Sequence, residues 1–310
     1  MLNKTTIVAI AIGTTACATA GFKRPVADFE AGISKTAEAV SVYYAELNSF
    51  ERELYLQERA LNPTLTVATQ SGGKPTALAG QTFSADSIKV RTDAIKLLGV
   101  HGKRLAALAG SDAPSDVAAG IKALGESFSG LATSFSSLTE TDASATKYVS
   151  PVTSLVGLVT QSILEARRDK LLTEAVTNGA PATRTIISLL EKDLDEIVGP
   201  QRLTGTKQAL VELIRDYNRR KSEMSVDDRR AALDEIRKAQ ERYEVAVVFS
   251  PSELFRALSD AHEALVTYAS SHRRNPDAAE LAAKLDVFRE RAEAAAKEIA
   301  RLRELKRGAA

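Results

Sequence analysis

Few side chains in this sequence are of the kinds that catalyse reactions or bind metals. Its three histidines are His101, His262 and His272, and no histidine or cysteine stands at a metal-binding spacing from any of them. We expect His262 to be a polar residue on a helix face rather than a ligand. The glycine-rich and nucleophile motifs of phosphate-binding and hydrolytic enzymes are also missing. The sequence therefore predicts a non-enzymatic protein with no catalytic residue, metal site or cofactor.

Paired carboxylates are the other group whose spacing could do chemistry. Glu191 with Asp195, and Asp193 with Glu196, would share a helix face and could hold metal ions between facing helices. The Glu-x-x-His element of such di-metal sites is absent, and lysines and arginines surround the pairs. We therefore expect these carboxylates to be surface charges.

Basic side chains gather once in the second half of the chain, at Arg215, Arg219, Arg220 and Lys221. Contact with anionic headgroups or a cell-wall polymer is one interpretation. Acidic residues within 216–228 neutralise the run, so a solvated helix end is favoured. The net charge of the whole chain is +1, which gives no support for a nucleic-acid partner.

The first sixteen residues have the order of a secretory signal. Lys4 supplies a positive charge, residues 7–12 form a short apolar run, and small residues follow at 13–16. The apolar run is too short to span a bilayer permanently. We therefore expect residues 1–16 to be a signal peptide of an exported protein.

Cys17, the only cysteine, stands directly after these small residues. The segment from Thr14 to Cys17 resembles the lipobox of bacterial lipoproteins, although Thr14 replaces the usual leucine. The resemblance implies lipid attachment at Cys17 and anchoring in a membrane of the cell envelope, facing the periplasm. Ala18 is not the aspartate typical of inner-membrane retention, which favours the outer membrane in a Gram-negative host. The alternative is an ordinary cleaved signal with an incidental cysteine.

Apolar residues then recur at alternating steps of three and four, the pattern of coiled-coil seams. One seam runs from Val26 to Leu54, another from Val117 to Leu138, and a third from Leu281 to Leu302. Tryptophan is absent and aromatic residues make up 5% of the chain, as is typical of long helices. The helices predicted from these patterns span about residues 25–61, 84–109, 117–138, 150–177, 181–217 and 276–302, and two further helices are predicted to begin near residues 226 and 251.

Breaks in the pattern predict the connections. Asn178-Gly179-Ala180-Pro181 combines a helix-ending Asn-Gly with a helix-starting proline, and Gly199-Pro200 should kink or break the next helix. Residues 64–82 show no helical period; they predict a loop, with 64–67 as a small strand. Residues 152–164 carry no charge, which predicts a buried central helix or, as the alternative, a membrane-inserting segment.

Together these patterns predict an all-α protein: an elongated up-and-down helical bundle with coiled-coil-like heptad packing. We expect a signal peptide (1–16), a lipidated tether (17–25), a first bundle segment (26–178) and a second segment (181–310) packed with the first. The favoured function is an envelope lipoprotein that presents its bundle to a protein partner or scaffold. The alternatives are a small-ligand module, with a pocket formed by Tyr43, Tyr44, Tyr55 and the 64–82 loop, and a membrane-active protein.

Overall fold

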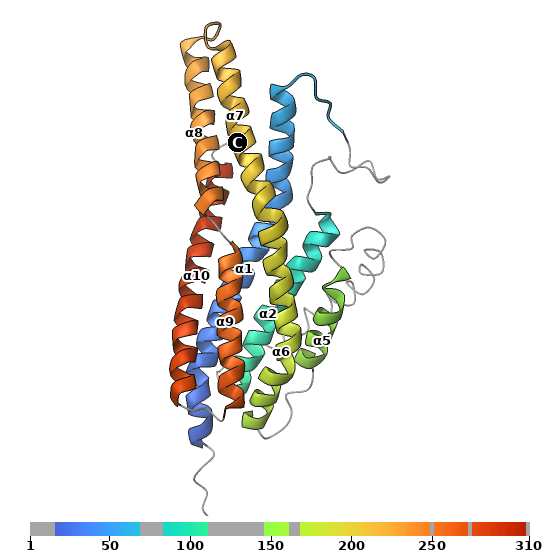
Figure 1. Ribbon diagram of the computed structural model, residues 1–310, viewed down its shortest axis with the longest axis vertical. Coiled ribbons are helices and arrows are strands. Elements are labelled where there is room, and N and C mark those ends of the chain that lie inside the picture. The colour runs from blue at the N-terminus through green and yellow to red at the C-terminus, as the bar shows by residue number, and fades with distance from the viewer. Residues whose placement is uncertain are drawn as a thin grey trace, which may run out of the picture.

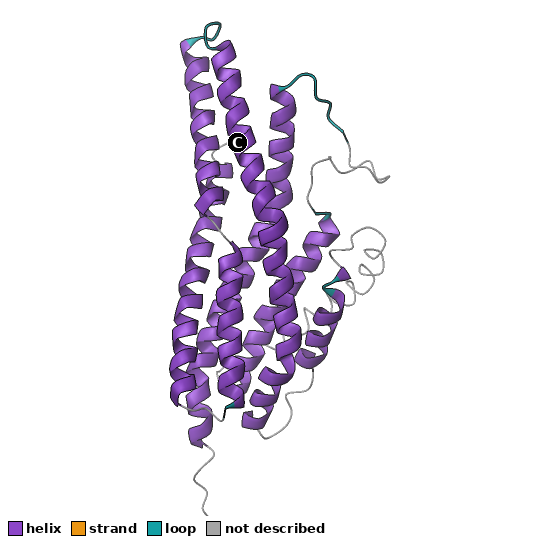
Figure 2. Cartoon of the chain, in the orientation of Figure 1, coloured by secondary structure: helices purple, strands orange, loops and turns teal. Residues whose placement is uncertain are grey.

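The computed structural model describes residues 16–68, 83–110, 146–160, 168–248, 251–271 and 275–307. Every regular element in these ranges is a helix, and the helices run along the length of an elongated bundle (Figures 1 and 2). This confirms the predicted all-α bundle. Among the described residues, none of the helices combines the length and apolarity that crossing a bilayer requires.

The helices follow the chain in this order: α1 (Ala16–Leu61), α2 (Ala85–Leu108), α5 (Val149–Thr160), α6 (Arg168–Lys192), the π-helical turn η1 (Asp193–Val198), α7 (Gly199–Arg220), α8 (Val226–Val248), α9 (Pro251–Ser270) and α10 (Asn275–Arg307). The helix predicted over 117–138 lies outside the described residues. We call residues 16–44 of α1 together with α2, α5, α6, α9 and α10 the base. Residues 47–61 of α1 together with α7 and α8 form the arm, whose helical hairpin stands at the top of Figure 1.

α1 is longer than its sequence pattern predicts. It ends at Leu61 as expected but begins at Ala16, so the residues expected to form a tether, 17–25, are its first turns. Pro25 lies inside the helix rather than at its start. The heptad seam is buried from Val26 to Leu47, where α2, α9 and α10 pack along it. The seam therefore forms the axis of the base.

Capping residues fix several helix starts where the sequence predicts them. The Ser84 hydroxyl accepts a hydrogen bond of 3.1 Å from the Ser87 backbone, and Ser225 does the same for Asp228 at 3.1 Å. The Asp228 carboxylate in turn accepts a hydrogen bond of 2.6 Å from the Ser225 hydroxyl. These contacts satisfy amide groups that the first turn of a helix leaves without partners.

The boundary predicted at residues 178–181 is wrong. α6 continues through it, with Pro181 inside the helix, and packs on α2, α5 and α9. The glycine has another purpose: a Cβ atom on Gly179 would lie 2.9 Å from Cε1 of His101. Gly179 therefore makes room for a neighbouring side chain rather than ending the helix, and the two predicted segments join in one bundle.

The interruption predicted at Gly199-Pro200 takes the form of η1. A proline has no amide hydrogen to donate to the carbonyl four residues earlier, and a π-helical turn absorbs that mismatch without ending the helix. α6, η1 and α7 therefore follow one another as a continuous helical segment from the base into the arm. The turn also changes which residues face inward.

The uncharged stretch after residue 152 belongs to the core as far as it is described. In α5, Val152, Leu155 and Val159 are buried and α6 packs against them. Residues 161–164 lie outside the described residues. The small strand predicted over 64–67 is wrong, since this stretch is an irregular turn with no partner strand in the described part of the chain.

Candidate functional site: the cleft between α1 and α7

A cleft of about 620 Å³ opens between the upper part of α1 and the beginning of α7. Its walls combine leucine side chains with amide, carboxylate and guanidinium groups. The lining residues are Leu47, Glu51, Leu54, Tyr55, Gln57, Glu58 and Leu61 from α1, and Pro200, Gln201, Arg202, Thr204, Gly205, Gln208, Ala209 and Glu212 from α7. A mostly apolar hollow with a few polar groups is the usual form of a binding site in proteins.

The two helices that form the cleft touch at a glycine. A Cβ atom on Gly205 would lie 2.9 Å from Cδ1 of Leu54, so only glycine allows this approach without a shift of the leucine. One turn further along α7, the Gln208 amide donates a hydrogen bond of 3.2 Å to Glu58. These two contacts set the distance between the walls.

Tyr55 forms part of the α1 wall, as the pocket hypothesis predicted, and it also anchors the chain that follows α1. Its hydroxyl accepts a hydrogen bond of 2.7 Å from the Ala68 backbone. The Arg59 guanidinium lies 3.3 Å from the centre of the Tyr55 ring and donates to the Thr66 carbonyl at 3.1 Å. Residues 66–68 are therefore held beside the cleft; residues 69–82 of the predicted loop lie outside the described residues.

Tyr43 supports the cleft from behind. Its hydroxyl accepts a hydrogen bond of 3.1 Å from Arg202, a lining residue that is only 7% exposed. Tyr44, by contrast, is wholly buried in the core, so its prediction as a pocket residue is wrong. Burial, followed by the nearby Asp193 carboxylate, raises the pKa of Tyr44 well above its ordinary value. Tyr44 is a structural residue that packs at 6.5 Å against the Phe83 ring.

Beneath the cleft lies a buried polar cluster that the sequence did not reveal. Arg91 is fully buried, and its Nε donates a hydrogen bond of 2.6 Å to Asp193. The Tyr148 hydroxyl donates to the same carboxylate oxygen at 2.6 Å. The Arg91 guanidinium also stacks 3.8 Å from the centre of the Phe83 ring. Burial raises the pKa of Tyr148, so its hydroxyl stays a donor to Asp193.

Asp193 corrects one carboxylate prediction: it is 8% exposed rather than a surface charge. The π-helical turn that begins with Asp193 changes the helical register, which the spacing of residues cannot reveal. The neighbouring Glu191 and Asp195 are paired with Arg256 on α9, at 2.9 and 3.0 Å, near the surface. They and the exposed Glu196 agree with the surface prediction.

The basic run at the end of α7 is a solvated helix end, as predicted. Arg215, Arg219, Arg220 and Lys221 are all exposed. Arg219 donates to Asp216 at 2.6 Å and Arg220 pairs with the same carboxylate. Burial opposes ionisation of Asp216, but the hydrogen bonds from Arg220 and Arg219 outweigh it and hold its pKa below the ordinary value.

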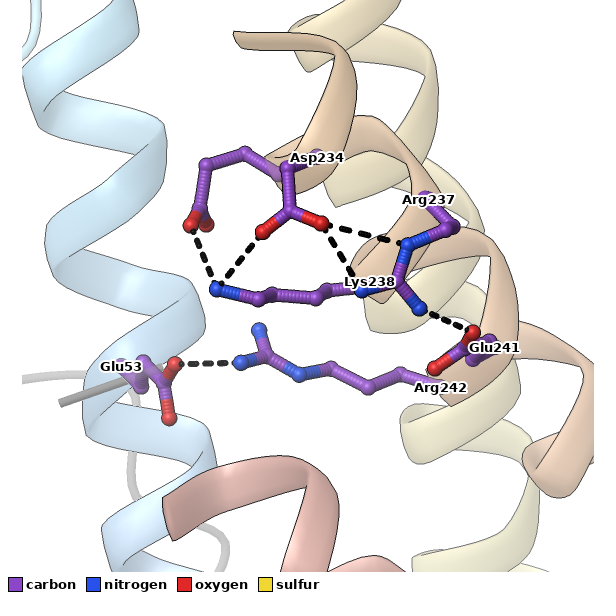
Figure 3. A network of polar contacts seen from close by, with 7 residues as sticks. Glu53, Asp234, Arg237, Lys238, Glu241 and Arg242 are labelled. Carbon is purple, nitrogen blue, oxygen red and sulfur yellow. Dashed lines mark hydrogen bonds and ion pairs between the residues drawn. The ribbon is translucent and has the colours of Figure 1, made fainter. Parts of the chain in front are cut away.

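Charged side chains also tie α8 to α1 across the arm (Figure 3). Arg242 forms an ion pair of 3.1 Å with Glu53, reaching from α8 to α1. On α8 itself, Arg237 bridges Asp234 at 2.8 Å and Glu241 at 2.5 Å, and Lys238 pairs with Asp234 at 3.0 Å. The pairs of Arg237 are exposed and contribute little to stability, whereas Arg242 is only 9% exposed and is the buried link between α8 and α1.

The predicted lipidation site and one of the histidines lie away from the cleft. Cys17, the predicted lipidation site, is the second residue of α1 and so lies at the opposite end of the bundle (Figure 1). His262, predicted on a polar helix face, is instead 1% exposed. The ring lies 6.2 Å from that of Phe29, because α9 packs this face against α1.

Across the described ranges, no three His, Cys, Asp or Glu side chains gather closely enough to hold a metal ion. The cleft contains carboxylates, but each of Glu58 and Glu212 already has an arginine partner, Arg59 at 2.8 Å and Arg215 at 2.7 Å. Comparisons of this chain with protein-family models, with curated proteins and with solved structures gave no match.

Proposed function

We propose that this protein is a lipid-anchored protein of the bacterial cell envelope that binds a partner protein through the cleft between α1 and α7. It acts as a non-enzymatic scaffold. The observation that carries the proposal is the position of the cleft at the end of the bundle away from Cys17. At 1.5 Å per residue, α1 places the cleft about 55 Å from Cys17 along the helix. A lipid on Cys17 would thus present the cleft well clear of the membrane surface.

The expected partner segment is an amphipathic helix. Leu47, Leu54 and Leu61 repeat at intervals of seven and line the cleft from α1. In the base, the same seam is covered by other helices, whereas here α7 faces it across the cleft. Leu47 is buried and closes the cleft at its lower end, and a helix with apolar residues at three- and four-residue steps could pack on the half-buried Leu54 and Leu61.

Photo-crosslinking in cells tests this proposal. A photoreactive amino acid at Gln208 in the cleft should give a discrete crosslinked band, and the same residue at Gln240 on the outer face of α8 should not. The blocking variant Leu61→Arg should remove the band, and Leu233→Arg should leave it unchanged. Equal bands from both positions, or a band indifferent to Leu61→Arg, would show that the cleft is not the binding surface.

A small-ligand binding protein is the second candidate, favoured by the size of the same cleft. A volume of about 620 Å³ falls within the range of ordinary ligand pockets. Arg202, Gln201 and Gln208 could orient polar groups of a ligand while the leucines cover its apolar part. A compound that raises the Tm of the wild type but not that of Leu61→Arg would support this function; a screen without such a compound would count against it.

A further inference from the structure

Two histidines that take no part in the cleft lie in the core of the base. His101 on α2 and His262 on α9 are each 1% exposed. Within the described part of the chain, none of their four ring nitrogens has a hydrogen-bond partner. Buried polar atoms almost always have such partners, so a pair of unsatisfied imidazoles calls for a physical explanation.

The surroundings of both rings are apolar. His101 fits against Gly179, where a Cβ atom would lie 2.9 Å from its Cε1 and 3.8 Å from Cδ1 of Leu155. His262 packs beside Phe29, with ring centres 6.2 Å apart. The rings are also close enough for a charge on His262 to disfavour a charge on His101. These apolar neighbours offer no partner to an imidazolium.

The charged residues around the pair favour neutral rings overall. On α2 and α6, Arg104 disfavours protonation of His101, and Arg184 disfavours protonation of His262. On α9, Glu263 acts in the opposite direction, but it is paired with Arg184. α5 carries no charged residue. The helices α1 and α10 bring Glu30, beside Gly102, and Lys284, which is paired with Asp260 at 2.8 Å.

The pKa values of both rings lie far below the ordinary value for histidine. Burial, then His262 and Arg104, lower the pKa of His101 to about 3. Burial is also the main cause at His262, where the pKa falls to about 4 despite the opposing Glu263. An apolar side chain at either position would avoid the cost of unsatisfied nitrogens. What an imidazole has and a leucine lacks is the ability to take up a proton near neutral pH.

We propose that His101 and His262 form an acid-sensitive joint: protons taken up by the pair separate α2 and α9 from α6, on which both helices pack, and loosen the base, while the α7–α8 hairpin keeps its structure. The closed base holds both rings neutral. Opening exposes them to water, where each takes up a proton, and the two positive charges then oppose closure. The device does not depend on what the cleft binds.

The lowered pKa values of both histidines determine how the stability of the closed base depends on pH. Each folded pKa is below the ordinary value of about 6.5, so the open state binds protons first as the pH falls. The stability of the closed base is complete above about pH 6.5 and is lost progressively below it. At pH 5.0 each histidine favours opening by about 30-fold, and the two together by about 1,000-fold, relative to neutral pH.

Hydrogen exchange of the full chain at pH 7.5 and 5.0, corrected for the intrinsic effect of pH, tests the joint. In the wild type, exchange in α2, α6 and α9 should rise at pH 5.0 by up to about 1,000-fold, and exchange in α7 and α8 by far less. His101→Gln/His262→Gln should lose most of this rise because glutamine does not titrate. His272→Gln, which removes the third histidine, should behave like the wild type. The proposal would be overturned if exchange in the wild type did not rise at pH 5.0, or if it rose as much in the double variant as in the wild type.

Ring titration in the unsubstituted protein covers the case in which the double variant does not fold. With ¹⁵N-labelled histidine, two of the three rings should remain neutral well below pH 6.5 and become protonated only together with loss of the folded spectrum. Ordinary titration of all three rings in an unchanged fold would contradict the joint equally clearly.

Discussion

The base and the arm are built from similar helices but differ in how far these helices are buried. In the base, α1 has neighbours on several sides, and its aromatic and aliphatic side chains are fully buried, as at Phe22, Phe29 and Ile33. In the arm, α7 and α8 pack mainly on each other and leave large apolar side chains exposed, among them Ile214 and Leu233. A heptad seam thus becomes core where other helices cover it and a cleft where they do not. The base stabilises the fold, and the arm offers a surface.

The largest expected effect concerns the anchor at the far end of the base. If a lipid on Cys17 anchors the protein as proposed, Cys17→Ser should move it from the membrane to the soluble fraction with its helical circular dichroism unchanged. The wild type should take up labelled fatty acid. A Cys17→Ser protein that stays in the membrane, or a wild type without label, would refute lipid anchoring.

The buried cluster should be the most sensitive polar feature of the fold. Asp193→Ala would leave Arg91 buried without its carboxylate, so we expect a loss of about 3–5 kcal/mol in the free energy of unfolding. Asp195→Ala, two residues away, removes only an exposed partner of Arg256 and should cost less than about 1 kcal/mol. Urea unfolding of both variants measures this difference. Equal losses would mean that Asp193 is not buried as described.

Apolar truncations compare the two regions directly. Leu258→Ala removes a fully buried side chain of α9 and should cost about 2–5 kcal/mol. Leu233→Ala in α8, where the side chain is 48% exposed, should change stability by no more than about 0.5 kcal/mol. Thermal unfolding followed by circular dichroism resolves both values. A large loss at Leu233 would show that something covers the arm.

A smaller effect than that of Leu258→Ala is expected at the link between α8 and α1. Arg242→Ala removes the ion pair with Glu53 together with the packing of a side chain that is only 9% exposed, and should cost about 1–2 kcal/mol. Hydrogen exchange should increase locally in α8 while the base remains unchanged. An increase that spreads into α9 or α10 would show that arm and base unfold as one unit.

The sequence predicts the helices well because their signals are local. Heptad steps and the capping serines at 84 and 225 depend on residues close together in the chain, and the structure confirms those helix starts. Gly179 misleads for the opposite reason: it makes room for His101, which is distant in the sequence. Local rules predict a helix boundary at Gly179 and Pro181, whereas both lie inside α6.

Only part of the candidate site could be predicted. The sequence suggests Tyr55 as a pocket residue, and Tyr55 lines the cleft. The opposite wall, from Pro200 to Glu212, cannot be recognised in the sequence, because exposed glutamines and a glycine occur in many helices. The burial of Asp193, His101 and His262 cannot be predicted, because a helix-period argument does not reveal a π-helical turn or the faces that distant helices cover. Those residues depend on tertiary packing, which propensity does not encode.

One comparison tests the division between base and arm most directly: crosslink yield from a photoreactive residue at Gln208, measured together with Tm, in the wild type, Leu61→Arg and Leu258→Ala. We predict that Leu61→Arg abolishes the crosslink and leaves the Tm within a few degrees. Leu258→Ala should lower the Tm by roughly 5–15 °C and keep the crosslink at temperatures where the protein is folded. If Leu61→Arg crosslinks like the wild type, or if the two measurements change together in both variants, binding does not belong to the cleft.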